Sequence, residues 1–167
     1  MNNFRLVCIA IIISLLSACG NSSPQDKTES AALSAAQKYY YKGEFKKAAP
    51  LFQALAERGN VRAEFFLGGM YLSGTGVPQD YAQALKWSSA AAKRGSTAAQ
   101  FNLGKMYEQG LGVKQDIVEA HMWYSLSASS GDEQATRQRD EVAHRMNYDQ
   151  IQEARKRAKA WLEAHHS

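Results

Sequence analysis

The chain has few of the residues on which several classes of protein depend. Its 167 residues include only two cysteines and three prolines. Two cysteines cannot supply a disulfide framework or a four-thiolate zinc site, and so few prolines exclude a proline-rich or collagen-like chain. Charge of one sign is also scarce, because 20 Lys and Arg against 16 Asp and Glu leave a net charge of +4. That excess is too small to indicate nucleic-acid binding, and none is expected.

The apolar run Leu6–Leu16 is too short to cross a membrane. Its 11 residues follow Arg5 and carry no charge, whereas a spanning helix needs roughly 20 residues. A short positive start followed by such a run is typical of an export signal. The sequence therefore predicts that residues 1–18 are a signal peptide.

The run ends in Leu16-Ser17-Ala18-Cys19-Gly20. This segment resembles the lipobox of bacterial lipoproteins, in which the cysteine is lipidated and becomes the first mature residue. The resemblance implies a lipid on Cys19 and, because Gly20 is not aspartate, an outer-membrane protein facing the periplasm. The alternative is an ordinary signal peptide that is cut near Ala18 and leaves Cys19 unmodified. Residues 19–29 hold no apolar side chain able to enter a core, so we expect them to form a flexible tether.

The body of the chain repeats with a period of 36 residues. Residues 60–95 and residues 96–131 are identical at 16 of 36 positions. In each unit the apolar residues of the first half recur at helical spacing, and a Gly-x-Gly turn then breaks the helix. Asp80 and Asp116 are predicted to cap the second helices, with Gln83 and Glu119 completing capping boxes. Each unit is therefore predicted to be a pair of antiparallel helices.

Both units carry the pattern Ala-x₃-Leu-Gly-x₂-Tyr-x₂-Gly-x-Gly-Val-x₂-Asp-x₃-Ala-x₂-Trp, from Ala63 to Trp87 and from Ala99 to Trp123. The pattern resembles the Sel1-like repeat, a relative of the tetratricopeptide repeat. Residues 30–59 are similar to a degenerate tetratricopeptide-like unit, and residues 132–167 indicate a C-terminal capping helix pair. The expected fold is all-α, a right-handed α-solenoid of about four antiparallel helix pairs.

No residue pattern points to catalysis. The four histidines lack cysteine or carboxylate neighbours at metal-ligand spacing, and the Gly-x-Gly turns lack the lysine of a phosphate loop. We expect no metal, no cofactor and no enzymatic activity. His121 is expected on an outer helix face, and Trp87 and Trp123 are expected in the core because they recur at the same position of each unit.

First helices line the concave face of such solenoids, so their outward side chains are the candidate binding residues. The N-terminal half of this surface is predicted to be aromatic and the C-terminal half charged, a composition typical of protein-binding surfaces. For Phe65 and Phe101 the alternative is packing between adjacent units. The candidates are Tyr40, Tyr41, Arg62, Phe65, Leu72, Phe101, Lys105, Glu108, Arg137 and Glu141.

The resemblance implies a monomeric adaptor or assembly module that binds a protein or extended peptide. Two other functions stay open at the level of sequence. One is an immunity lipoprotein that neutralises a toxin or effector enzyme. The other is an accessory protein in the processing of peptidoglycan or another polymer.

Overall fold

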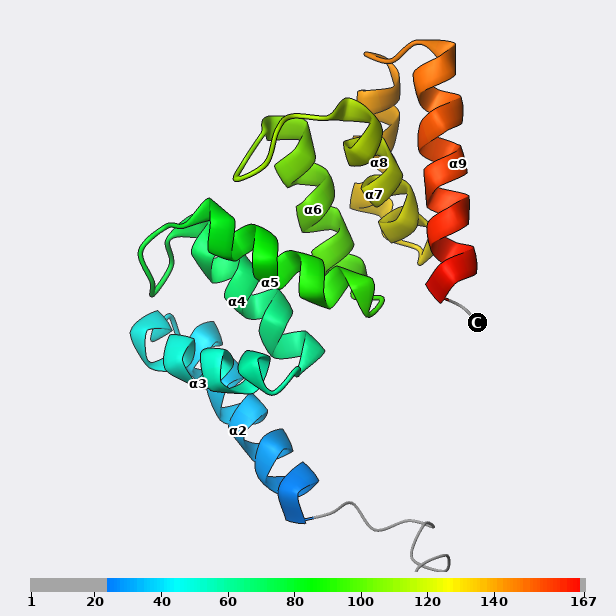
Figure 1. The fold of residues 1–167 in the computed structure, drawn as a ribbon. Helices are drawn as coiled ribbons and strands as arrows, with labels where there is room; N and C mark the ends of the chain where they lie inside the picture. The colour runs from blue at the N-terminus through cyan, green and yellow to red at the C-terminus, as the bar shows by residue number, and fades with distance from the viewer. Residues whose placement is uncertain (1–23, 166–167) are drawn as a thin grey trace, which may run out of the picture.

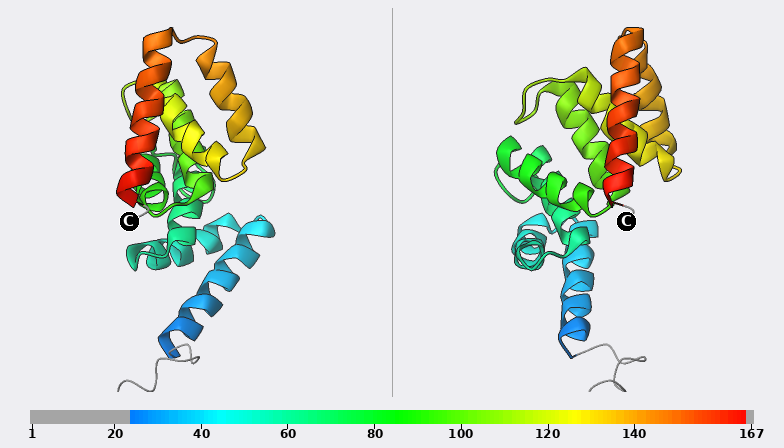
Figure 2. Two further views of the ribbon diagram at one scale, coloured as in Figure 1. Left: turned by 90° about the vertical axis from the view of Figure 1, so that its right-hand side faces the viewer. Right: turned by 45° about the vertical axis from the view of Figure 1, so that its right-hand side comes forward.

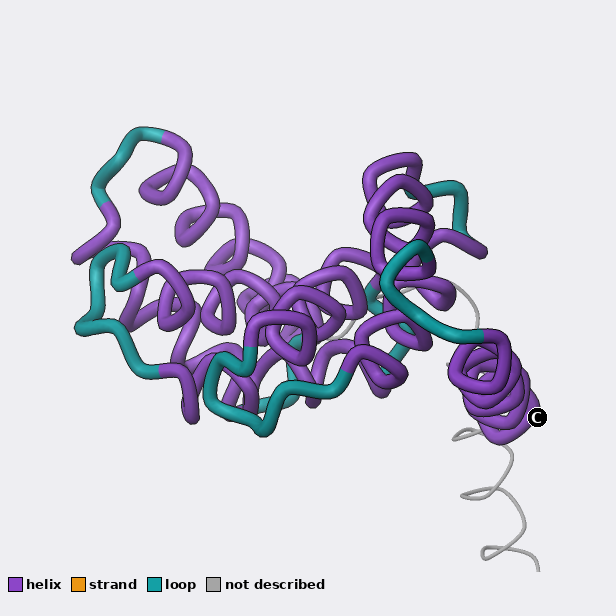
Figure 3. The backbone as a smooth tube through the Cα atoms, turned by 90° about the horizontal axis from the view of Figure 1, so that it is seen from above, coloured by secondary structure: helices purple, strands orange, loops and turns teal. Residues whose placement is uncertain are grey.

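The computed structural model describes residues 24–165, and every regular element in that range is a helix (Figure 1). The predicted all-α solenoid is confirmed, and turns or short loops join the helices without any strand in the described range (Figure 3). The helices are α2 (Pro24–Tyr41), α3 (Phe45–Glu57), α4 (Val61–Ser73), α5 (Tyr81–Lys93), α6 (Thr97–Gln109), α7 (Ile117–Ser129), α8 (Glu133–Ala143) and α9 (Tyr148–His165).

Each of the helices α2 to α7 packs on the helix that follows it in the chain. Helix α4 also contacts α6, so the first helices of two successive units lie side by side. The expected signal peptide and Cys19 lie outside the described residues. Among residues 24–165, no helix combines the length and the apolar character that a membrane span requires.

Helix α2 begins at Pro24, so the prediction of a flexible tether as far as Glu29 is wrong for its last six residues. Proline suits the first turn of a helix, and Asp26 in that turn interacts favourably with the helix dipole. Glu29, in the second turn, also accepts a hydrogen bond from Asn60 Nδ2 at 2.8 Å, which ties the start of α2 to the next unit. Residues 24–29 form a helix without an apolar stripe of their own. The sequence analysis took the lack of apolar residues as the sign of a tether, so it missed this helical turn.

The N-terminal caps of the second helices are confirmed. Asp80 accepts hydrogen bonds from the backbone N–H groups of Ala82 and Gln83, and Asp116 does the same for Val118 and Glu119. The prediction that Gln83 and Glu119 complete capping boxes is wrong, because neither side chain bonds back to the N–H group of the capping residue. The backbone N–H of Asp80 donates instead to the Tyr71 carbonyl, and that of Asp116 donates to the Tyr107 carbonyl. The Gly-x-Gly turns are thus closed by the backbone of the preceding helix.

The second glycine of each turn touches the backbone of the preceding unit. Gly76 and Gly112 have φ of 77° and 69°. A β-carbon on Gly76 would lie 2.6 Å from the Phe45 carbonyl oxygen, and one on Gly112 would lie 2.5 Å from the Tyr81 carbonyl oxygen. Both the positive φ and the close approach therefore require glycine.

Helix α7 is buried almost all round, because α6, α8 and α9 all pack on it. Trp123 is 8% exposed, as predicted, and so is its counterpart Trp87. The expectation for His121 is wrong, because this side chain is only 3% exposed. Burial lowers the pKa of His121, and nearby Arg139 adds to that effect.

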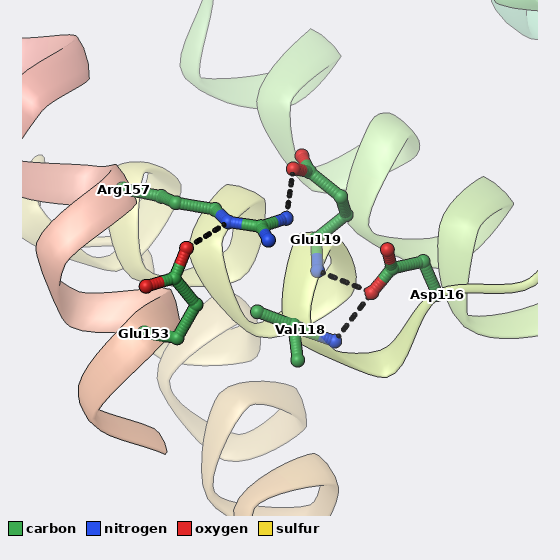
Figure 4. Close-up of polar contacts among 5 residues, drawn as sticks. All are labelled: Asp116, Val118, Glu119, Glu153 and Arg157. Atoms are coloured by element: carbon green, nitrogen blue, oxygen red, sulfur yellow. Dashed lines mark hydrogen bonds and ion pairs between the residues drawn. The ribbon is translucent and has the colours of Figure 1, made fainter. Parts of the chain in front are cut away.

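The last two helices do not form the expected pair. Helices α8 and α9 both pack on α7 (Figure 2). The apolar residues of α9 explain this, because Trp161 meets the ring of Trp123 at 5.9 Å and Ala158 joins the same cluster. Arg157 on α9 also pairs with Glu119 on α7 at 2.6 Å and with Glu153 at 2.8 Å (Figure 4). Helix α8 offers little apolar surface, with only Ala135 and Val142 buried.

Candidate functional site

A pocket of about 620 Å³ opens on the side of the array where the first helices lie. We call it the aromatic pocket. Helices α2, α4 and α6 and the turn between α5 and α6 supply its walls. Its lining residues are Gln37, Tyr41, Val61, Arg62, Phe65, Phe66, Arg94, Gly95, Ser96 and Ala98.

Three of the predicted binding residues meet in this pocket. Tyr41 stands at the end of α2 and is 74% exposed. Arg62 is exposed on the first turn of α4, and Phe65 lies almost one turn further along that helix. Phe65 also packs against the cluster that α5, α6 and α7 form, so this side chain both lines the pocket and packs between units.

Tyr40 does not belong to the surface that the sequence predicted. Its ring lies 5.2 Å from that of Phe45 and 5.0 Å from that of Phe66, inside an aromatic cluster that also includes Phe52. The side chain is half-buried and packs against the core of the first two units. Tyr40 is therefore a residue of the fold.

Two further candidates pack between units. Leu72 contacts the cluster shared by α5, α6 and α7. Phe101 lies 5.5 Å from the ring of Tyr124 and joins the cluster that contains Val142 of α8. For Phe101, packing between adjacent units is the alternative that the structure supports.

The other charged candidates, apart from Arg62, lie on α6 and α8, away from the aromatic pocket. Glu108 accepts a hydrogen bond from the Tyr124 hydroxyl at 2.9 Å and pairs with Arg145 at 3.0 Å, so it links α6, α7 and the end of α8. Lys105 is exposed. Arg137 pairs with Glu133 at 3.7 Å, and Glu141 accepts a hydrogen bond from Gln138 at 2.9 Å.

Arg94 is a pocket residue that the sequence analysis missed. It lies at the end of a second helix, whereas only first helices were considered. Its guanidinium donates to the Gly59 carbonyl and to Glu64 Oε1, the latter at 3.3 Å, while 49% of the side chain stays exposed. Phe66 was missed too, although its replacement by Asn102 in the next unit marks a position where the repeat changes chemistry.

Glu64 lies behind Arg94 and is buried. It is 3% exposed, and its Oε2 has no hydrogen-bond partner among the residues that the structure describes. Burial raises the pKa of Glu64, and the positive charge of Arg94 opposes that rise. Arg94 is therefore held in place from behind while it faces the pocket.

The arrangement is suited to binding. Aromatic rings and guanidinium groups line the pocket, and no carboxylate is among its lining residues. Between residues 24 and 165, no three His, Cys, Asp or Glu side chains gather in a way that could hold a metal ion.

The Sel1 repeat family matches the chain twice, over residues 61–96 and 97–132. The chain is similar to the crystal structure of a protective antigen of uropathogenic Escherichia coli strains that displays an SLR fold, with a TM-score of 0.77 and 31% identity. That match covers 82% of this chain and 30% of the antigen.

A Sel1 repeat protein from Oxalobacter formigenes is similar over a shorter stretch, with a TM-score of 0.53 and 36% identity. This match covers 54% of this chain and 26% of the other. The chain thus spans less than a third of the length of either solved structure. No curated protein matches it. Sel1 repeats generally mediate protein–protein interactions, and their solenoid is typically a non-catalytic scaffold.

Proposed function

Because the chain is a Sel1-like repeat protein, we propose that it is a lipid-anchored adaptor of the bacterial envelope that holds a segment of a partner protein in its aromatic pocket. The observation that carries the proposal is the convergence of Tyr41, Arg62 and Phe65 from two helices on one concave surface. Tyr and Arg are enriched among the residues that dominate binding energy at protein interfaces. A volume of about 620 Å³ suits a few side chains of an extended segment.

The walls of the pocket belong to packed helices, which supports a preformed binding surface. Arg94 is fixed by Gly59 and Glu64, and Phe65 is fixed by its contact with the core of the next unit. A surface that is already ordered loses little conformational entropy when a partner binds. The proposed mechanism is therefore passive capture of a partner segment, with no chemical step.

The proposed anchor places the array close to the membrane. Pro24 follows Cys19 by five positions, and five residue steps span at most about 18 Å when fully extended. Helix α2 has 18 residues, which corresponds to a length of about 27 Å. Tyr41 lies at the far end of this helix, so the linker and α2 together allow the pocket to lie some distance from the outer membrane to which we assign the lipid.

Site-specific photo-crosslinking in cells tests the binding surface. A photoreactive amino acid at Tyr41 is expected to give a discrete crosslinked partner. The same amino acid at Tyr148 is the matched control, because Tyr148 is 75% exposed against 74% for Tyr41 and lies outside the pocket. Identical crosslinks from both positions, or none from Tyr41, would contradict the proposal.

Mass spectrometry of the mature protein tests the anchor. We expect a mature chain that begins at an acylated Cys19 and a Cys19→Ser variant that is released from the membrane fraction. A mature N-terminus without acyl chains, at Cys19 or elsewhere, would remove the lipoprotein assignment and leave the pocket argument unaffected.

A further inference from the structure

The charged residues that line the aromatic pocket are both positive, and the carboxylate of Glu64 lies behind the lining. Arg62 and Arg94 are its only charged lining residues, and the remaining eight are uncharged. Arg62 is exposed and has no ion-pair or hydrogen-bond partner among residues 24–165. An unpaired guanidinium beside aromatic rings is a site for a carboxylate, because its planar donors match the two carboxylate oxygens.

Arg94 adds directed donors to the same site. One of its terminal nitrogens already donates to Gly59 and Glu64, which fixes the plane of the guanidinium. The side chain is still 49% exposed and lines the pocket, so part of it stays accessible to a ligand. The raised pKa of the buried Glu64 shows that the carboxylate behind Arg94 is costly to keep charged.

Apart from Gln37 and Ser96, most of the remaining lining is apolar or aromatic. Val61, Phe65 and Phe66 on α4 and Ala98 on α6 form the surface beside the two arginines, and the ring of Tyr41 stands at its edge. This apolar surface favours a ligand that brings an apolar side chain next to its negative charge. A phosphate group or an acidic glycan would leave that surface uncovered.

We propose that the partner segment is an extended acidic peptide in which an Asp or Glu stands next to an apolar side chain. The carboxylate pairs with Arg62 and is oriented by Arg94, while the apolar side chain lies against Phe65 and Phe66. This assignment rests on the proposed function and names the chemical class of the segment that the pocket holds.

A random-peptide display library selected on the full chain tests the proposal. We expect the selected peptides to be enriched in Asp or Glu next to Leu, Ile, Val or Phe. Their affinity, measured by calorimetry, should fall about tenfold or more in Arg62→Glu, which corresponds to about 1.4 kcal/mol. It should also fall as the salt concentration rises.

Arg58→Glu is the matched control for Arg62→Glu. Arg58 is also exposed, lies only four residues earlier, and is not among the residues that line the pocket. Peptide affinity is expected to stay unchanged in Arg58→Glu. An equal loss in both variants, or selected peptides without acidic residues, would overturn the assignment of an acidic segment.

A Tyr41→Ala variant separates the two levels of the argument. Peptides that bind this variant as tightly as the wild type do not use the pocket, and that result refutes the proposed function itself. Peptides that lose affinity in Tyr41→Ala but not in Arg62→Glu refute only the acidic assignment. A library that yields no binder refutes both. Pocket-dependent binding of phosphatidylglycerol vesicles without any peptide binding would replace the peptide with a lipid surface.

Discussion

The buried carboxylate of Glu64 makes a sharp prediction about stability. Its Oε1 lies 3.3 Å from Arg94, and its Oε2 is buried without a hydrogen-bond partner in the part of the chain that the structure describes. The repeat offers a template for a better residue, because the equivalent position in the next unit is Gln100. Gln100 is also buried, and its Nε2 donates to the Ala92 carbonyl at 3.4 Å. We therefore predict that Glu64→Gln stabilises the fold at neutral pH.

The magnitude follows from two opposing effects. The variant loses the charge on Glu64 that faces Arg94, and because Arg94 is half-exposed that pair contributes at most about 1 kcal/mol. It also removes an unsatisfied buried acceptor, which costs about 1–3 kcal/mol. The new amide can donate to the Ala56 carbonyl, the counterpart of Ala92. The expected gain is about 1 kcal/mol, or roughly 2–4 °C in Tm for a chain of this size.

The raised pKa of Glu64 also predicts how the stability difference between Glu64→Gln and the wild type changes with pH. Folding raises the pKa of Glu64 through burial, so ionisation of this group destabilises the native state at pH values above its folded pKa. As pH falls below the unfolded pKa, the carboxyl is protonated in both states and this penalty disappears. The advantage of Glu64→Gln should therefore be larger at pH 7 than at pH 4 and should shrink as pH falls through the acidic range.

Thermal melts followed by circular dichroism at pH 7 and pH 4 measure both effects. Glu57→Gln is the control, because Glu57 is exposed on α3 and its substitution should change stability by less than about 0.5 kcal/mol. A Glu64→Gln variant that melts below the wild type at pH 7 would refute the reasoning. An advantage that is the same at both pH values would show that the charge of Glu64 is not its cause.

Three further predictions concern the fold and are measured by chemical denaturation. Gly112→Ala and Gly131→Ala should each lower the free energy of unfolding by about 1–2 kcal/mol, because both positions have positive φ. Gly112→Ala should lose about 1–3 kcal/mol more, because its new β-carbon crowds the backbone of the preceding unit, whereas Gly131 has open space around it. Equal losses in the two variants would contradict the inter-unit contact. Tyr124→Phe should cost about 1–2 kcal/mol, because it removes the hydrogen bond to Glu108, and a neutral result would show that this bond contributes nothing net. Asp116→Ala should cost about 1 kcal/mol through loss of the helix cap, and an unchanged midpoint would exclude that role.

The parts of the structure that follow from neighbouring residues could be predicted from the sequence. The caps at Asp80 and Asp116 depend on one side chain and the next two or three backbone N–H groups, so local pattern is sufficient. The burial of Trp87 and Trp123 follows from their recurrence on the same face of each unit.

The parts that depend on contacts across the array could not be predicted in this way. The position of α9 on α7 follows from the packing of Trp161 on Trp123, which lies 38 residues earlier in the chain. The repeat does not extend to α9, so it could not predict this contact. Tyr40 and Tyr41 are adjacent and chemically identical, yet the helix packs Tyr40 against Phe45 and Phe52 and leaves most of Tyr41 exposed. Arg94 reaches the pocket from the residue that follows α5. The sequence analysis considered only positions on the first helices, so it did not include this residue.

The contacts of Gly76 with Phe45 and of Gly112 with Tyr81 join main chain to main chain. The spacing of successive units at these turns is therefore set by backbone atoms, and it does not depend on exposed side chains such as Tyr41, Arg62 and Lys105 on α2, α4 and α6. Substitutions on these helices can change which ligand is preferred while the frame keeps its dimensions. A scaffold built in this way can acquire a new binding specificity by surface mutation alone, because the arrangement of its helices stays the same.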